Sequence, residues 1–163
     1  MRLVAVDGPS GAGKTVFAAE LAADLRAAGV STALVPTDHF ATWDDPVSWW
    51  PRLVEGVFDP LAKAEPGRYQ ALRWQDGNPL RGEFVDVPVC DVLIVEGVSS
   101  GRRSIASRLS GLVHLDGPSA AERLERAVAR DGEACRMPLL RWQEFERGWF
   151  AVDRPRARAD WRM

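Results

Sequence analysis

The chain is poor in the residues that build disulfides, zinc sites and membrane spans. It has two cysteines, Cys90 and Cys135, and their spacing matches no metal-binding motif. We expect both to be buried, neutral side chains in a reducing cytosol. The strongest apolar run, Val92–Val95, is far shorter than a membrane-spanning helix, and the N-terminal residues lack a signal-peptide layout. The sequence therefore predicts a cytoplasmic protein that does not bind a membrane.

Lysine is also scarce, because only Lys14 and Lys63 occur among the 21 lysine and arginine residues. The formal net charge of −2 gives no bulk attraction to nucleic acid, so we expect no nucleic-acid partner. Every basic residue after position 100 is an arginine, whose planar guanidinium group suits phosphate. In a chain that otherwise uses arginine, Lys14 is expected to have a specific chemical role.

Alternating strand and helix patterns predict the fold class. Short apolar runs predict strands at 3–6, 32–35, 92–95 and 112–115. Helical spacing and cap signals predict helices at 13–28, 49–63, 119–130 and 138–152, the second one interrupted near Pro51 and Pro60. Glycines punctuate the segment 66–88, which predicts a small antiparallel excursion. The pattern indicates an α/β protein, one domain over residues 1–163, with a parallel sheet, helices on both faces and a ligand site at the carboxyl ends of the strands.

The segment GPSGAGKT, from Gly8 to Thr15, is a phosphate-binding motif. It lies between a predicted strand and a predicted helix, which is the context that the P-loop pattern requires. Its glycines let backbone N–H groups point into one hollow at the start of the helix, where the helix dipole adds positive potential. We expect Lys14 to reach the phosphates and Thr15 to offer its hydroxyl to Mg²⁺. The alternative, a glycine-rich turn that binds nothing, is disfavoured by the strand and helix on either side. The expected nucleotide-binding residues of this loop are Gly8, Ser10, Gly11, Ala12, Gly13, Lys14 and Thr15.

Two carboxylates follow predicted strands. Asp38 follows the second strand and could accept a proton from a hydroxyl, bind metal-bound water, or do both. An Asx turn or a helix cap explains it equally well from local sequence alone. Glu96 follows the most apolar strand, where a metal-positioning acid beside a P-loop belongs; the alternative is an acid in solvent. His39 is expected to lie on the surface.

Arginines and aromatic residues supply the remaining candidates. Arg123, Arg126 and Arg130 share one helix face by their spacing, either as a solvated face paired with nearby glutamates or as a lid over a transferring phosphoryl group. In the excursion, Arg68-Tyr69 and Arg73-Trp74 suit a flat or hydroxylated acceptor. Trp74 is the tryptophan that we expect near a ligand. The tryptophans expected mainly in packing are Trp49, Trp50, Trp142, Trp149 and Trp161.

Taken together, these motifs resemble the uridine kinase-like branch of P-loop kinases, and the resemblance covers nearly the whole chain. The matching segments are Gly8–Thr15, Thr37–Phe40, Phe58–Leu61, Arg68–Trp74, Val95–Val98 and Arg123–Asp131. The resemblance implies a three-layer P-loop kinase core with a helical lid, and transfer of a phosphoryl group from Mg·ATP to a hydroxyl.

It also implies roles for individual residues. The expected catalytic residues are Lys14, Asp38 and Arg130, and Arg126 joins the loop residues as a nucleotide contact. The expected metal-binding residues are Thr15, Asp38 and Glu96. The expected acceptor-contacting residues are Asp38, Phe40, Arg68, Tyr69, Trp74 and Glu96.

Three functions stay open at this point. The first is an ATP-dependent kinase that acts on a small-molecule hydroxyl. The second is a nucleoside monophosphate-type kinase, in which Arg52, Arg68 and Arg73 would hold a phosphate acceptor. The third is a regulatory nucleotide-binding protein without kinase activity; the absence of an Asn-Lys-x-Asp element argues against a GTPase. The lid segment 131–136 lacks the family's arginine-glycine-arginine element, so the identity of the acceptor stays open. The oligomeric state also stays open, and a homodimer is one alternative.

Overall fold

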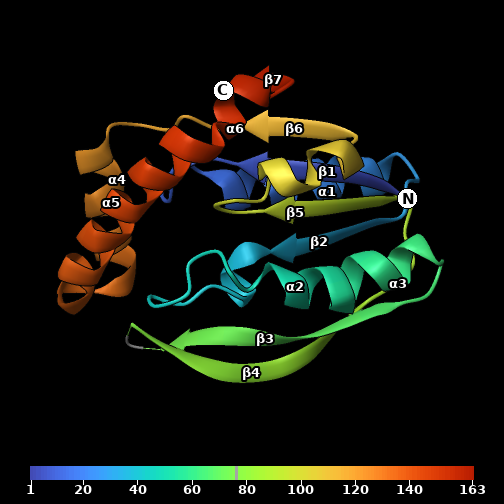
Figure 1. The fold of residues 1–163 in the computed structure, drawn as a ribbon, viewed down its shortest axis with the longest axis horizontal. Coiled ribbons are helices and arrows are strands. Elements are labelled where there is room, and N and C mark those ends of the chain that lie inside the picture. Colours follow the sequence, from blue (N-terminus) through green and yellow to red (C-terminus); the bar gives the residue numbers. More distant parts are fainter. Residues whose placement is uncertain (76) are drawn as a thin grey trace.

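The computed structural model describes residues 1–75 and 77–163. Within them, the central sheet has five strands in the order β2-β5-β1-β6-β7, and all neighbouring strands run parallel (Figure 1). The strands are β1 Arg2–Asp7, β2 Thr32–Pro36, β5 Val92–Glu96, β6 Gly111–His114 and β7 Trp161–Arg162. Every residue of β5 is buried between β2 and β1, as the unbroken apolar run Val92–Val95 predicts. The predicted α/β class with a parallel sheet is confirmed.

The strands alternate their side chains between two separate cores. Helix α1, Lys14–Ala27, packs on one face through Ala18 and Ala22, where it meets Val6 and Ile94 of the sheet. The opposite face buries a second core, in which sheet residues such as Leu93 meet the helical segment that follows β2. Helices therefore cover both faces, which is the predicted layered arrangement.

The helical segment after β2 is continuous where the sequence predicted interruptions. Helix α2, Trp50–Leu53, runs through a π-helical turn at Val54–Phe58 into α3, Asp59–Ala62. The predicted breaks near Pro51 and Pro60 are wrong. Each proline occupies one of the first two positions of a helical segment, where its missing N–H group is not needed, and the wider π turn makes room for the second one.

The predicted antiparallel excursion is confirmed as a hairpin of β3, Gly67–Gln75, and β4, Asn78–Val87. Figure 1 shows it on the outer side of α2 and α3, away from the central sheet. A β-bulge interrupts the strand pairing between Gln70 and Leu72. Before the bulge the odd-numbered residues face the core, and after it Trp74 is the half-buried one while Arg73 is exposed. The bulge thus decides which residue at the hairpin tip faces inward.

A helical lid lies beyond the carboxyl ends of the strands (Figure 1). It contains α4, Ala120–Asp131, and α5, Arg136–Asp153, and α6, Pro155–Arg158, follows. A capping box begins α4, with Ser119 and Glu122 bonded to each other's backbone N–H groups, as the cap signals of the predicted helix at 119–130 indicate. Strand β7 was not predicted, because two residues are too few to show a period. Among the described residues, no helix combines the length and the apolar character that crossing a bilayer requires.

A buried carboxylate joins the end of β1 to the loop after β5. Asp7 is fully buried, and its two oxygens accept hydrogen bonds from the backbone N–H groups of Gly8 at 2.7 Å, Ser99 at 3.2 Å and Gly101 at 2.8 Å. Burial raises the pKa of Asp7 to about 6, although the three N–H donors oppose this shift. This carboxylate therefore fixes the start of the phosphate-binding loop from inside the protein.

Folding raises the pKa of Asp7 from 3.8 to about 6, so the folded chain holds this proton more tightly than the unfolded chain. The resulting stabilisation is complete below about pH 4 and is lost as the pH rises through about 6. Between about pH 5 and pH 7.5, the wild-type protein should lose about 1 kcal/mol more unfolding free energy than Asp7→Asn, which cannot titrate. Urea unfolding at both pH values measures this difference, and the shared histidines cancel in the comparison. Equal pH dependence of the two proteins would contradict the prediction.

Candidate active site

The phosphate-binding loop owes its shape to close contacts as well as to glycine's conformational freedom. Gly8 and Gly11 have φ angles of 140° and 77°, which other residues rarely adopt. A Cβ atom on Gly8 would overlap the carbonyl oxygen of Leu115, and one on Gly11 would lie 3.0 Å from Cβ of Arg123. The loop is thus pressed against the segment after β6 and against α4. In the described part of the chain the N–H groups of Lys14 and its neighbours in the loop's last turn have no backbone acceptor, so they are available to an anion such as phosphate.

The last two residues of this loop, Lys14 and Thr15, lie near Glu96 at the end of β5. The ammonium group of Lys14 is buried and donates to the carbonyl of Pro9 at 2.8 Å. The hydroxyl of Thr15 donates to Oε1 of Glu96 at 3.1 Å, across from the end of β5. Burial raises the pKa of Glu96, and the nearby charge of Asp38 raises it further, while Lys14 and the hydrogen bond from Thr15 lower it. Residues 81 positions apart in the sequence thus form one oxygen-rich pair.

This pair fits a magnesium ion that is shared with phosphate. Within residues 1–75 and 77–163 no group of three or more His, Cys, Asp or Glu side chains could hold a metal by itself. Mg²⁺ in nucleotide sites usually takes one or two protein oxygens and completes its shell with phosphate and water. Thr15 and Glu96 offer such oxygens next to the loop. The donor set therefore suits a nucleotide-bound Mg²⁺ rather than an all-protein metal site.

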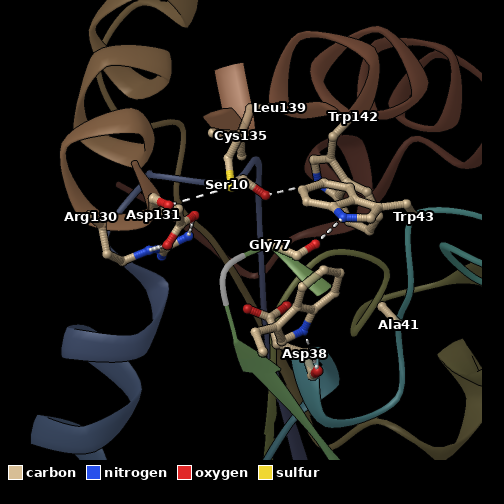
Figure 2. A pocket seen from close by; sticks show the side chains of 11 residues that line it. Ser10, Asp38, Ala41, Trp43, Gly77, Arg130, Asp131, Cys135, Leu139 and Trp142 are labelled. Atoms are coloured by element: carbon tan, nitrogen blue, oxygen red, sulfur yellow. Dashed lines mark hydrogen bonds and ion pairs between the residues drawn. The ribbon is translucent and has the colours of Figure 1, made fainter. Parts of the chain in front are cut away.

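Asp38 lies in a tight turn, Thr37–His39, directly after β2. Its position relative to Glu96 is set by a close backbone approach, because a Cβ atom on Gly97 would overlap the buried side chain of Thr37. The carboxylate of Asp38 is exposed and lines a cavity of about 390 Å³ (Figure 2). In the described part of the chain this carboxylate makes no hydrogen bond or ion pair. It is therefore free to act on a molecule in the cavity.

The cavity is built from segments that are far apart in the sequence. Ser10 comes from the phosphate-binding loop, Asp38 from the turn after β2, and Arg130 and Trp142 from the lid (Figure 2). Trp74, from the hairpin, lines the cavity as well, and its contact with an acceptor stays a prediction. Since the phosphate-binding loop forms one wall, a molecule in this cavity would lie beside a nucleotide's terminal phosphate.

Two tryptophans of the cavity were missed by sequence reasoning. Trp142 was expected in packing, but its indole N–H donates to Oγ of Ser10 at 2.9 Å and to Glu146 at 2.8 Å, and its ring lines the cavity. Trp43 had no predicted role, and it donates to the carbonyl of Gly77 at 2.7 Å. The sequence signal for Trp142 was Glu146, an acid four residues later on an otherwise aromatic helix face.

Four predicted acceptor contacts lie outside the cavity, and one of them is Glu96, which instead bonds to Thr15. Phe40 is 1% exposed and packs between Trp49 and Tyr69, so it belongs to the core. Tyr69 is itself buried, with its hydroxyl 2.8 Å from Nδ1 of His39. Arg68 points to the outer face of the hairpin. The alternation of β3 places neighbouring residues on opposite faces, which is why the pair Arg68-Tyr69 cannot act together. The expectation of a surface histidine is also corrected, since the His39 ring is half-buried and its burial lowers its pKa.

The three arginines of α4 have different environments. Arg130 lines the cavity, and its guanidinium group binds both carboxylate oxygens of Asp131, at 2.6 and 2.7 Å. Arg123 is half-buried under the phosphate-binding loop and donates to the carbonyl of Pro118 at 2.7 Å. Arg126 is exposed and does not line the cavity. Of the predicted arginine face, only Arg130 faces the cavity in this arrangement.

Glu146 connects the lid to the phosphate-binding loop. It projects from α5, is 2% exposed, and its Oε1 accepts a hydrogen bond from the backbone N–H of Ser10 at 2.8 Å. The same oxygen accepts from the indole of Trp142. A buried acid on a helix thereby holds one edge of the loop and orients a wall of the cavity.

Comparisons with known proteins place the chain by its fold. No family model matches the chain, and no curated protein matches it. A solved structure named as that of a possible uridine kinase from Bacillus stearothermophilus superposes with a TM-score of 0.69 at 18% identity, over 99% of this chain and 88% of that chain. A second, named for a fructose transport system kinase from Silicibacter sp. TM1040, gives a TM-score of 0.59 at 27% identity, over 79% of this chain and 71% of that chain. The resemblance inferred from the motifs is therefore confirmed at the level of the fold.

Removing the Glu146 carboxylate should weaken the contact between α5 of the lid and the phosphate-binding loop. We expect Glu146→Ala to lower the free energy of unfolding by about 1–3 kcal/mol, because the partly buried N–H of Ser10 loses its acceptor. Glu144→Ala is the matched control on the same helix, since that side chain is exposed and its ion pair, with Arg147, is long at 3.9 Å. Its effect should stay within about 0.5 kcal/mol. Urea unfolding measures both, and equal effects would mean that the contact with Ser10 contributes nothing.

Proposed function

We propose that this protein is a kinase that transfers the γ-phosphoryl group of Mg·ATP to a hydroxyl group of a small molecule. The observation that carries the proposal is a cavity lined by both Ser10 of the phosphate-binding loop and Asp38, whose carboxylate makes no hydrogen bond or ion pair among the described residues. The Thr15–Glu96 pair lies close by, since the charge of Asp38 raises the pKa of Glu96. The kinase names of the structures with the same fold support a phosphotransferase.

Each residue of the site has a task that follows from its position. Mg·ATP would supply the phosphoryl group and the charge of the metal ion. The loop's N–H groups and the buried ammonium of Lys14 would hold the phosphates, and Thr15 and Glu96 would supply oxygens for the metal. Arg130, at the cavity wall, would neutralise negative charge during transfer once it leaves Asp131.

Asp38 is suited to activate the acceptor. A hydroxyl group must lose its proton as it forms a phosphate ester, and a positioned carboxylate can take that proton. Asp38 faces the cavity and has no hydrogen bond or ion pair of its own in the described part of the chain. In this reaction the acceptor oxygen forms its bond to phosphorus, the bond to the leaving ADP breaks, and the proton goes to Asp38.

A phosphate acceptor finds little support in the site. The arginines that would have held it, Arg52, Arg68 and Arg73, do not line the cavity. Arg52 donates to a carbonyl of β3, and Arg68 pairs with Asp86 across the hairpin. Arg73 donates to the side chain of Gln75. The cavity's own arginine is already neutralised by a carboxylate. A neutral hydroxyl acceptor fits this wall better than a second phosphate.

ADP release in the presence of Mg·ATP tests the proposal directly. Unphosphorylated alcohols from a small-molecule panel should stimulate it, and Lys14→Ala should reduce the stimulated rate by about 10²-fold or more. Lys63→Ala is the control, because Lys63 is an exposed lysine that does not line the cavity. Stimulation by monophosphates alone would support a phosphate acceptor. Nucleotide binding without release on any compound would support a regulatory protein.

Asp38→Asn separates catalysis from nucleotide binding. The amide keeps the shape of the side chain but cannot accept a proton as the carboxylate does, so kcat should fall by about 10²–10⁴-fold. That range corresponds to about 3–5 kcal/mol of activation free energy. ATP affinity should change little, because the loop and Lys14 hold the phosphates. Steady-state kinetics with calorimetric ATP titration measures both quantities, and a loss confined to ATP affinity would make Asp38 a metal-binding or structural residue.

A further inference from the structure

Three tryptophans form a corner at one side of the cavity, which we call the tryptophan corner: Trp43, Trp74 and Trp142. The ring of Trp43 lies 4.9 Å from that of Trp74 at an interplanar angle of 72°, and 5.9 Å from that of Trp142 at 79°. All three line the cavity, and the rings of Trp43 and Trp142 lie side by side in Figure 2. Nearly perpendicular rings enclose a compact group from several sides, whereas a flat ring needs two parallel faces.

The indole N–H groups of the corner are all directed to the protein. Trp43 donates to the carbonyl of Gly77, and Trp142 donates to Ser10 and Glu146. Trp74 makes a long hydrogen bond of 3.4 Å to the carbonyl of Asp38. The corner therefore presents ring carbons to the cavity and keeps its N–H donors out of it. The faces of these rings carry negative electrostatic potential, which attracts cations.

The charged groups around the cavity also favour a cation. Arg130 and Asp131 bind each other through two hydrogen bonds and largely cancel. Asp38 remains as a carboxylate without a hydrogen bond or ion pair among the described residues. Lys14, another cation of the proposed site, donates to the loop carbonyl of Pro9 and does not line the cavity. The acceptor cavity thus combines three aromatic rings with two carboxylates, Asp38 and Asp131, and a single arginine, Arg130.

We infer that the acceptor is a small amino alcohol, whose positively charged ammonium group lies in the tryptophan corner while its hydroxyl faces Asp38. The inference rests on the proposed kinase function and names its substrate class. A compact cation gains attraction from the aromatic faces and from the carboxylate, whereas a neutral molecule of the same shape gains contact area alone. The hydroxyl oxygen attacks the γ-phosphorus of the nucleoside triphosphate, the bond to the nucleoside diphosphate breaks, and the hydroxyl proton passes to Asp38, while the ammonium group is unchanged.

Calorimetric titration of the full chain without nucleotide tests the charge preference. Two matched pairs serve as probes: choline with its neutral isostere 3,3-dimethylbutan-1-ol, and glucosamine with glucose. At least one ammonium compound should bind about tenfold more tightly than its neutral partner. Equal or weaker binding of both ammonium compounds, tighter binding of uridine, or no binding of either ammonium compound would overturn the inference.

Variants of Trp74, which is half-buried, show whether the corner is responsible. Trp74→Leu should weaken ammonium binding about 3- to 10-fold and leave the neutral partner unchanged, whereas Trp74→Phe, which keeps an aromatic face, should retain most of the affinity. Trp161→Leu is the control, because that ring is 54% exposed on β7 and does not line the cavity. Equal losses of ammonium and neutral ligand in Trp74→Leu would overturn the inference.

ADP release measured with the same compounds separates this inference from the kinase proposal. Ammonium compounds that bind at the corner but never stimulate release would preserve the substrate-class recognition and contradict the kinase. Stimulation by neutral alcohols alone would preserve the kinase and overturn the amino alcohol.

Discussion

Close packing of backbone segments at the carboxyl edge of the sheet is the constraint on which the site depends. Asp7 is fully buried and ties the loop after β1 to the segment after β5 through three backbone N–H groups. Gly8 and Gly97 have no room for a side chain where they meet Leu115 and Thr37. Because these contacts leave little freedom, the loop, Glu96 and the turn that carries Asp38 have fixed relative positions. The site is therefore organised by the core of the fold.

The lid and the hairpin complete what the core begins. Glu146 brings α5 onto the phosphate-binding loop, and the same contact orients Trp142 toward the cavity. The hairpin contributes Trp74 from the opposite side, and Trp43 bridges the two. This wall of the cavity is thus assembled from three segments that are joined mainly by aromatic contacts. The fold alone does not specify such a wall, because it depends on the particular side chains that the three segments carry.

Sequence reasoning succeeded where the chemistry is local and failed where strand geometry decides. The motif from Gly8 to Thr15 specifies its conformation through neighbours in the chain, so its position could be predicted. Phe40 and Tyr69 are chemically suitable for an acceptor, but both are buried, and a β-bulge that the sequence does not reveal directs Trp74 inward. Trp142 was assigned to packing, because the spacing to Glu146 is a weak signal and the hydrogen bond to Ser10 spans 132 positions.

The sequence by itself determined the α/β class, the parallel sheet, the glycine-rich loop between β1 and α1, the hairpin and the capped lid helix, because apolar periodicity, glycines and caps act over a few residues. Tertiary structure alone decided the pairing of Thr15 with Glu96, the burial of Phe40, the neutralisation of Arg130 and the tryptophan corner. These features depend on how strands and helices distant in sequence approach one another. Their geometry is fixed by the packing of the whole chain, which local patterns do not encode.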